Sequence, residues 1–256
     1  MLAHARAILS VDFPQAVDEL EKALLSFSIP IEELVASGGG EAKGTQRLRK
    51  DLNLRGWRKQ TFTIEKMING RRAESISHEV DHVKEFEGGA LALEIEWNNK
   101  DPFFDRDLEN FKRLHAEGAI SIGVIVTRGT SIQNQIRSLI LRFANDRDVG
   151  GFDDLQRFGV NPTARQRRDI EKKARSSQTK SPTAPELAFR EAWSSHFVSD
   201  KFGAATTHWE KLQARVSRGV GNPCPLLLIG IPQSVLTFGE PETVVTRLIE
   251  ESSGDD

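Results

Sequence analysis

Three acidic residues have types and spacing suited to metal-dependent chemistry. Asp81 stands in one run of alternating apolar and polar residues, and Glu94 and Glu96 stand in another. Gly88-Gly89 separates the runs, and this pattern predicts a β-hairpin with the glycines at its turn. In that register Asp81 faces Glu96, and Val83 faces Glu94. Because side chains alternate across a strand, the three acids share one sheet face.

Carboxylates that lie side by side on a sheet repel one another, so such a cluster is typical of a cation site. Oxygen ligands without thiols suit Mg²⁺, which also keeps water molecules for a phosphate substrate. A magnesium site of this kind favours phosphodiester hydrolysis. The spacing is common, however, and an exposed polar face whose acids pair with Lys84, Lys100 or Arg106 fits it too. The acids by themselves leave both interpretations open.

The neighbouring residues favour the first interpretation. The motifs are Asp81-His-Val-Lys84 and, after a short strand, Ala-Leu-Glu94-Ile-Glu96-Trp. They resemble the active-site hairpin of the BglII/BstYI group of type II restriction endonucleases, in the PD-(D/E)XK nuclease superfamily. Roughly half of the chain shares the resemblance in the same order; the further segments are 48–59, 104–111, 119–126 and 222–231. The resemblance implies an α/β fold with a mixed central β-sheet flanked by α-helices.

By that resemblance, Asp81 and Glu94 are the metal-binding acids, and the backbone carbonyl of Ile95 completes the ligand set. The third position departs from the pattern, since the superfamily usually has lysine there and this group glutamine, whereas this chain has Glu96. Glutamate can bind a second metal or accept a proton from the attacking water, but it supplies no positive charge. Lys84 is the nearest candidate for that charge and for DNA contact. Strand parity puts it on the opposite face, so a bulge or a long reach is needed.

The resemblance implies magnesium-dependent cleavage of double-stranded DNA at a short palindromic site, leaving 5′-phosphate and 3′-hydroxyl ends. A homodimer is implied as well, because a two-fold protein matches a two-fold target. Two alternatives stay open. One is a DNA-repair or other DNA-binding nuclease on the same fold, and the other is a non-catalytic DNA-binding module.

The pattern around the acids predicts the elements that position them. Successive strands are expected from Trp57 to Glu96, with a first break at Asn69-Gly70. Asp101-Pro102 begins a helix that Gly118 ends. A buried strand over 120–126 and an amphipathic helix over 132–143 follow. Two further helices are expected upstream, over 13–27 and 41–54. This order suits a mixed sheet flanked by helices, within a single domain over residues 1–256.

A basic stretch lies within residues 145–200, which have no counterpart in the resemblance and could form an inserted DNA-binding arm or subdomain. Its candidates for phosphate contact are Arg165, Arg167, Arg168 and Lys172. Asp169 and Glu171 are interspersed, so a solvated charged helix is equally consistent. The Ser, Thr and Pro residues within 176–185 predict a linker. Arg215 and Arg218 form a second basic candidate.

Composition sets wider bounds. The chain has 35 basic and 37 acidic residues, so its overall charge does not indicate a nucleic-acid partner. Its single cysteine, Cys224, lies in an apolar run and is expected to be buried, and the lack of any disulfide within the chain fits a reducing cytoplasm. No apolar run approaches 18 residues, so no membrane association is expected. His78 and His82 fall on the face opposite the acids and are expected to pack rather than to bind metal.

Overall fold

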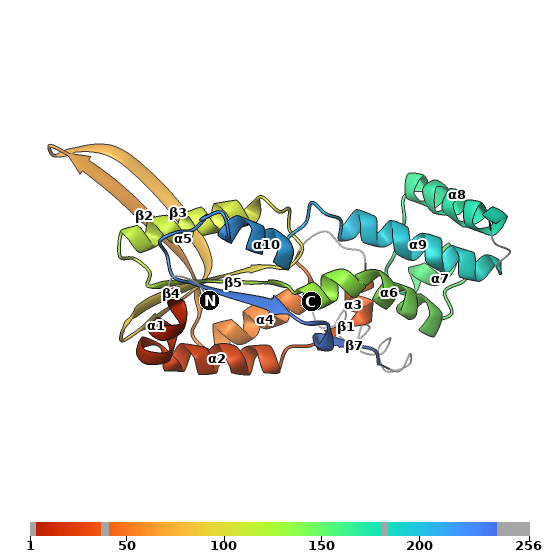
Figure 1. The fold of residues 1–256 in the computed structure, drawn as a ribbon, viewed down its shortest axis with the longest axis horizontal. Coiled ribbons are helices and arrows are strands. Elements are labelled where there is room, and N and C mark those ends of the chain that lie inside the picture. The colour runs from red at the N-terminus through yellow and green to blue at the C-terminus, as the bar shows by residue number, and fades with distance from the viewer. Residues whose placement is uncertain (1–3, 37–40, 181–183, 240–256) are drawn as a thin grey trace, which may run out of the picture. The chain divides into compact units, whose positions relative to one another are not determined.

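A five-stranded mixed sheet forms the centre of the fold, with strand order β2-β3-β4-β5-β6 (Figure 1). The computed structural model describes residues 4–36, 41–180 and 184–239. β2, β3 and β4 pair antiparallel, and β4, β5 and β6 pair parallel. The strands are β2 (Arg58–Ile68), β3 (Arg71–Phe86), β4 (Gly89–Glu96), β5 (Ile122–Arg128) and β6 (Leu226–Ile231). The predicted mixed sheet and the near-uniformly apolar buried strand β5 are therefore confirmed.

The described chain divides into two compact units, and the sheet belongs to the first. This unit comprises Met1–Phe27, Thr45–Gln133 and Ala205–Pro232, and the second comprises Ser28–Gly44, Asn134–Ala204 and Gln233–Asp256. Residues 145–200 lie within the second unit. The arrangement of the chain as a single domain with an inserted arm stays a prediction.

Helices of the first unit pack on the sheet. They are α1 (Ala5–Asp12), α2 (Pro14–Leu25), α4 (Lys43–Leu54), α5 (Phe103–Ala116) and α10 (Trp209–Val216). α5 buries Phe104, Leu108 and Phe111 against Val83 and Ala92 of the sheet in one hydrophobic cluster. The helix predicted after Asp101-Pro102 is confirmed, so the segment between β4 and β5 crosses over the face where the acids lie.

The hairpin that carries the acids has a different register from the predicted one. Gly89 already belongs to β4, so Glu87 and Gly88 form the turn and Phe86 pairs with Gly89. His82 consequently pairs with Leu93. The predicted pairing was two residues out. An even shift leaves the residues that pair with β4 on their predicted faces, so Glu94 and Glu96 still face the same side as Val83. The residues of β3 that precede the bulge between Val80 and Val83 change faces.

The second unit is mainly helical. Its helices are α3 (Ile31–Val35), most of α6 (Thr130–Asp146), α7 (Phe152–Gln156), α8 (Ala164–Lys180) and α9 (Pro185–Lys201), with a small parallel pair β1 (Ile29–Pro30) and β7 (Leu236–Thr237) beside the short 3₁₀ helix Gln233–Val235. The predicted linker over 176–185 is wrong in its first half, because α8 continues through Lys180. Residues 181–183 lie outside the described part.

Candidate active site

The site lies where β3 and β4 run side by side beneath α5. Glu94 and Glu96 lie near the end of β4, two residues apart, so their side chains share one face of the sheet. Asp81 lies on β3, next to the pair His82–Leu93. The backbone N–H of Asp81 donates a hydrogen bond of 3.4 Å to Oε1 of Glu94. Asp81 therefore lies beside Glu94 and not, as predicted, opposite Glu96.

A β-bulge shapes β3 at this point. The pairing passes from Arg58–Val83 to Gln60–Val80, so β3 carries one more residue than β2 over this stretch. Val80 and Val83 both reach the hydrophobic cluster beneath α5, while Asp81 between them is exposed. Bulges often re-aim side chains beside active sites. Here the bulge presents Asp81 to solvent at the edge of two buried glutamates.

Burial raises the pKa of both glutamates. Glu94 is 4% exposed and Glu96 is 3% exposed. Burial raises the pKa of Glu94 to about 9, and the charges of Asp107 and Asp81 add to this effect. Burial and the charge of Asp107 raise the pKa of Glu96 to about 8. Without a compensating cation, both carboxyl groups hold a proton at neutral pH.

Asp107 is a fourth acid that the sequence interpretation missed. It lies on α5, is 1% exposed, and burial raises its pKa. Its Oδ1 accepts a hydrogen bond of 2.8 Å from Nε of Arg106, whereas its Oδ2 has no hydrogen-bond partner in the described structure. Asp107 follows Phe104 by three residues and precedes Phe111 by four, so it shares their buried helix face. A carboxylate on an apolar helix face was the signal that could have found it.

Besides Asp107, with which it shares a carboxyl–carboxyl contact, Glu96 has two polar partners. Nδ2 of Asn99 donates a hydrogen bond of 2.8 Å to Oε2, and the Arg106 guanidinium lies 3.6 Å from Oε1. Arg106 is about half exposed and stacks over the ring of Phe103, 4.5 Å from its centroid. Lys84, Lys100 and Arg106 were the predicted partners of the acids. In the described structure, Arg106 is the one of these three that pairs with an acid of the site.

The donor set fits a hard divalent cation. Within the described ranges, no group of three His, Cys, Asp or Glu side chains is placed to hold a metal. The set that the resemblance implies needs only two carboxylates, of Asp81 and Glu94, and the Ile95 carbonyl. All of these donors are oxygens, the ligands that Mg²⁺ prefers. The raised pKa values and the unpartnered oxygen of Asp107 indicate a site with too little positive charge.

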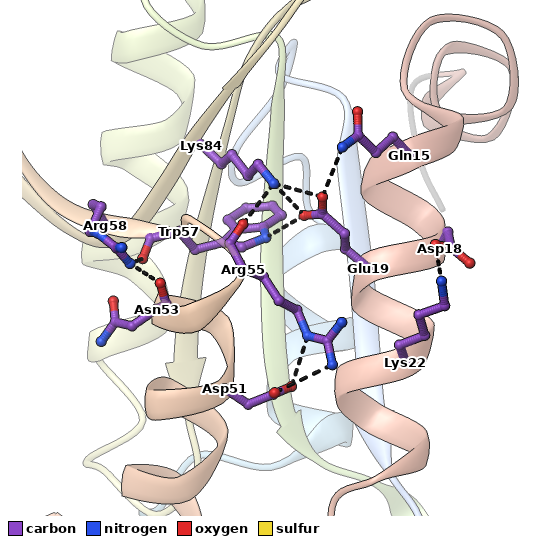
Figure 2. A network of polar contacts seen from close by, with 10 residues as sticks. All are labelled: Gln15, Asp18, Glu19, Lys22, Asp51, Asn53, Arg55, Trp57, Arg58 and Lys84. Atoms are coloured by element: carbon purple, nitrogen blue, oxygen red, sulfur yellow. Dashed lines mark hydrogen bonds and ion pairs between the residues drawn. The ribbon is translucent and has the colours of Figure 1, made fainter.

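Lys84 lies on the opposite side of the hairpin (Figure 2). Its Nζ donates to both carboxylate oxygens of Glu19, at 2.6 and 2.7 Å, and to the Arg55 carbonyl at 2.7 Å. Nε1 of Trp57 donates to the same glutamate at 3.2 Å. An ammonium has three donors, and these contacts use all of them. The bulge in β3 precedes Lys84 and does not bring it to the acids.

The basic candidates near the C-terminus of the first unit differ from each other. Arg215 is buried and bonds to Asp105 at 2.9 Å and to Asp101 at 3.3 Å, so it holds the start of α5. Arg218 is exposed and donates to the Ala214 carbonyl at 3.0 Å. The guanidinium of Arg215 is therefore not placed on the surface, as DNA contact would require.

In the second unit, α8 presents part of the predicted basic set to solvent. Arg165, Arg168 and Lys172 are exposed and form no ion pair within the described residues. Arg167 instead donates to the Pro162 carbonyl at 3.2 Å and lies over the ring of Phe152. The basic face of α8 thus consists of three of the four predicted residues.

The predicted burial of Cys224 is confirmed, and burial raises its thiol pKa to about 12. His78 and His82 are also buried, and burial lowers the pKa of His82 to about 4. The predicted face is wrong for His78, because the bulge in β3 puts it opposite Phe62, on the face that Asn110 and Arg113 of α5 cover. In the part of the chain that the structure describes, no helix has both the length and the apolar character needed to cross a membrane.

A mixed sheet with flanking helices and a carboxylate-bearing hairpin at its centre defines the class of restriction-endonuclease-like nucleases. The family model "Restriction endonuclease BglII/BglIII" matches residues 2–231 of the chain. The chain therefore belongs to this family of DNA-hydrolysing enzymes, which supports a type II site-specific nuclease. No curated protein matches the sequence. The family disfavours both alternatives, the repair nuclease and the non-catalytic module.

Proposed function

We propose that this enzyme is a magnesium-dependent restriction endonuclease that cuts double-stranded DNA at a short palindromic site and leaves 5′-phosphate ends. The observation that carries this proposal is the placement of Asp81 beside Glu94 on a bulged hairpin, with Glu96 and Asp107 buried next to them. Glu94, Glu96 and Asp107 lie around Arg106, and Asp81 lies beside Glu94, with Lys59 as a more distant cation. Such an excess of negative charge suits a cation and not a packed core.

Asp81, Glu94 and the carbonyl of Ile95 would hold the metal. When bound, Mg²⁺ supplies Lewis-acid polarisation of the scissile phosphate and lowers the pKa of a coordinated water. Glu94 must lose its proton to bind the metal, so metal binding is coupled to proton release.

Glu96 would accept the proton of the attacking water. Its pKa of about 8 is near the pH at which a general base works well, because it combines basicity with a useful deprotonated fraction. The hydrogen bond from Asn99 fixes Oε2, so Oε1, which lies 3.6 Å from the Arg106 guanidinium, would be the oxygen that takes the proton. This role explains why a glutamate can stand where the superfamily usually has lysine.

Arg106 would supply the positive charge that the superfamily usually obtains from lysine. Its guanidinium lies 3.6 Å from Glu96, is about half exposed, and lies over the ring of Phe103. A guanidinium binds phosphate oxygens in a two-pronged geometry. Lys84 is already saturated by Glu19 and Arg55, so we assign it a structural role.

The wider assembly follows from symmetry and charge. A palindromic target is matched by a homodimer, whose two active sites cut the two strands. The exposed residues Arg165, Arg168 and Lys172 are the proposed phosphate contacts of the second unit. The cytoplasm is the proposed compartment, because the chain's single cysteine is a buried thiol.

Cleavage of phage DNA tests this proposal. The purified enzyme is incubated with Mg²⁺, the fragment ends are sequenced, and the dimer is sought by light scattering. Discrete fragments with 5′-phosphates at one palindromic sequence are expected. Asp81→Ala and Glu94→Ala should each reduce single-turnover cleavage by at least about 10³-fold, since metal stabilisation of the transition state amounts to several kcal/mol. Near-normal cleavage by either variant would overturn the site assignment, and ragged degradation would overturn the site-specific activity.

A further inference from the structure

From residue 65 to residue 75, β2 and β3 form a two-stranded ribbon that extends beyond the packed part of the first unit. β3 pairs with β4 only from His82 to Phe86, so its residues up to Val80 pair with β2 alone. Figure 1 shows the two strands continuing past the rest of the sheet as a curved hairpin. Every residue from 65 to 75 is exposed, including Met67 and Ile68. A two-stranded ribbon without support is marginally stable in water, so its length needs a reason outside the core.

The ribbon has a cationic face at its tip. Arg71 pairs with Ile68, which is two residues beyond Lys66 along β2, so Lys66 and Arg71 lie on one face. Neither forms an ion pair within the described ranges. Arg72, on the other face, is paired with Glu65 at 3.1 Å. Glu74 is the cross-strand partner of Lys66 on the same face, so this face carries two cations and one carboxylate and has an excess of one positive charge.

This cationic face is continuous with the sheet face that holds the acids. Phe62 and Ile64 precede Lys66 on the same face of β2, and both pack against the cluster that contains Ala92. Ala92 precedes Glu94 by two residues on β4, so it shares the face of Glu94 and Glu96. One sheet surface thus runs from the catalytic acids to Lys66 and Arg71.

The length of the ribbon matches the dimensions of duplex DNA. Arg71 and Asp81 are ten residues apart on β3, which at about 3.3 Å per residue is at most about 33 Å. One turn of B-DNA is about 34 Å long. A groove of the duplex also admits a two-stranded β-ribbon.

We infer that the β2–β3 ribbon lies along the substrate duplex and that Lys66 and Arg71 contact its phosphates up to one helical turn from the scissile bond. This inference rests on the proposed nuclease function and extends it to a second DNA-contacting surface. Charge decides between the two kinds of occupant. A second copy of the chain would meet the like charges of its own ribbon tip, whereas a duplex supplies the missing negative charge. The exposed residue Ile68, which shares the face of Lys66 and Arg71, then lies close to the groove wall.

The experiment compares duplex length with ribbon charge, in the absence of divalent metal so that no cleavage is needed. Wild type, Lys66→Ala/Arg71→Ala and the charge-keeping control Lys66→Arg/Arg71→Lys are titrated with mixed-sequence duplexes of about 10 and about 30 base pairs, roughly one and three helical turns. On the longer duplex the double alanine variant should bind on the order of tenfold more weakly than wild type, with a salt slope lower by about 0.9 per lost contact. On the short duplex the two proteins should bind alike, because the ribbon extends past its end.

The remaining outcomes overturn the inference. An equal loss on both duplexes would place these cations close to the scissile bond, and no loss on either would remove them from DNA binding. A variant with unchanged DNA affinity but an altered oligomeric state, measured by light scattering, would show that the ribbon holds a second copy. These results are independent of the proposed function, which depends on cleavage by wild type and its loss in Asp81→Ala.

Discussion

The two faces of the β3–β4 hairpin carry charged clusters that are built in opposite ways. On one face, Lys84 donates all three of its hydrogen bonds to Glu19 and Arg55, and Trp57 adds another to the same glutamate (Figure 2). On the other face, Glu94, Glu96 and Asp107 are buried with a single arginine nearby. One cluster is neutral and saturated, and the other lacks positive charge.

This difference separates structural from functional charge. A saturated ion pair holds α2, α4 and the sheet together and has no capacity left for a ligand. A cluster of buried acids with too few cations lowers the free energy of unfolding, because burial disfavours the charged form of each acid. Binding of a cation restores that free energy. Breaking the first cluster should therefore harm the fold, and breaking the second should harm the chemistry.

After the loss of cleavage expected for Asp81→Ala and Glu94→Ala, the next largest effect is expected at Glu96. Glu96→Gln keeps the size of the side chain and removes its capacity to accept a proton, so single-turnover cleavage should slow by about 10²-fold, the scale of one general base. Glu96→Lys should retain little of the wild-type cleavage activity, because the surrounding site is fitted to a negative charge. A loss below about tenfold for the glutamine variant would reduce Glu96 to an incidental neighbour.

Arg106 and Lys84 give a direct comparison of the two clusters. Arg106→Ala should slow cleavage by at least about tenfold, because a charge-assisted contact to phosphate is worth about 1.5–3 kcal/mol. Lys84→Ala should leave cleavage at saturating DNA nearly unchanged. It should lower the free energy of unfolding by about 2–3 kcal/mol, since it leaves Glu19 partly buried without its partner. Urea unfolding and single-turnover rates on both variants measure this, and a reversed pattern would exchange the two roles.

The pH dependence of stability should come from the acid-rich cluster. In the metal-free folded protein the pKa of Glu94 is about 9 and that of Glu96 about 8, against 4.5 when unperturbed. A raised folded-state pKa gives stability that is complete below about pH 4.5 and is lost as pH rises through 8 and 9. Glu94→Gln should flatten this decline, and Mg²⁺ at pH 8 should raise the melting temperature of wild type more than that of the variant.

The exposed turn residue Glu87 supplies the matched control for that experiment. Glu87→Gln removes one carboxylate from the same hairpin without touching the buried cluster, so its stability should follow the wild-type pH curve. Identical curves for wild type and Glu94→Gln would contradict the origin of the pH dependence in the buried glutamates.

Much of the fold was predictable because it follows local patterns. The alternation along β2 to β4, the apolar run of β5 and the Asp-Pro start of α5 each depend on residues close in sequence. The shared face of Asp81, Glu94 and Glu96 was predictable for the same reason. The register was two residues out because a turn at Glu87-Gly88 and one at Gly88-Gly89 carry nearly the same sequence signal.

The rest depended on contacts between distant segments. Lys84 meets Glu19, which lies 65 residues earlier in the chain, and no pattern near Lys84 announces that partner. Asp107 joins the site only because α5 crosses over β4. Arg215 forms ion pairs with Asp101 and Asp105 at the start of the same helix. Sequence identifies a charge, whereas only the packed structure shows whether that charge is already compensated.

The smallest effect is expected on α8, where the same distinction between compensated and free charge divides one helix. Arg165, Arg168 and Lys172 are exposed without ion pairs in the described structure, whereas Arg175 is paired with Glu171 at 3.5 Å. Replacing the three free residues with alanine should weaken binding to specific and random DNA alike and lower the salt slope by about 0.9 per lost contact. Sequence preference should stay the same, because phosphate contacts position a protein without reading bases. Arg175→Ala is the matched control and should leave the slope unchanged. An unaltered slope in the triple variant would make α8 a solvated helix and leave the DNA-binding surface to the first unit.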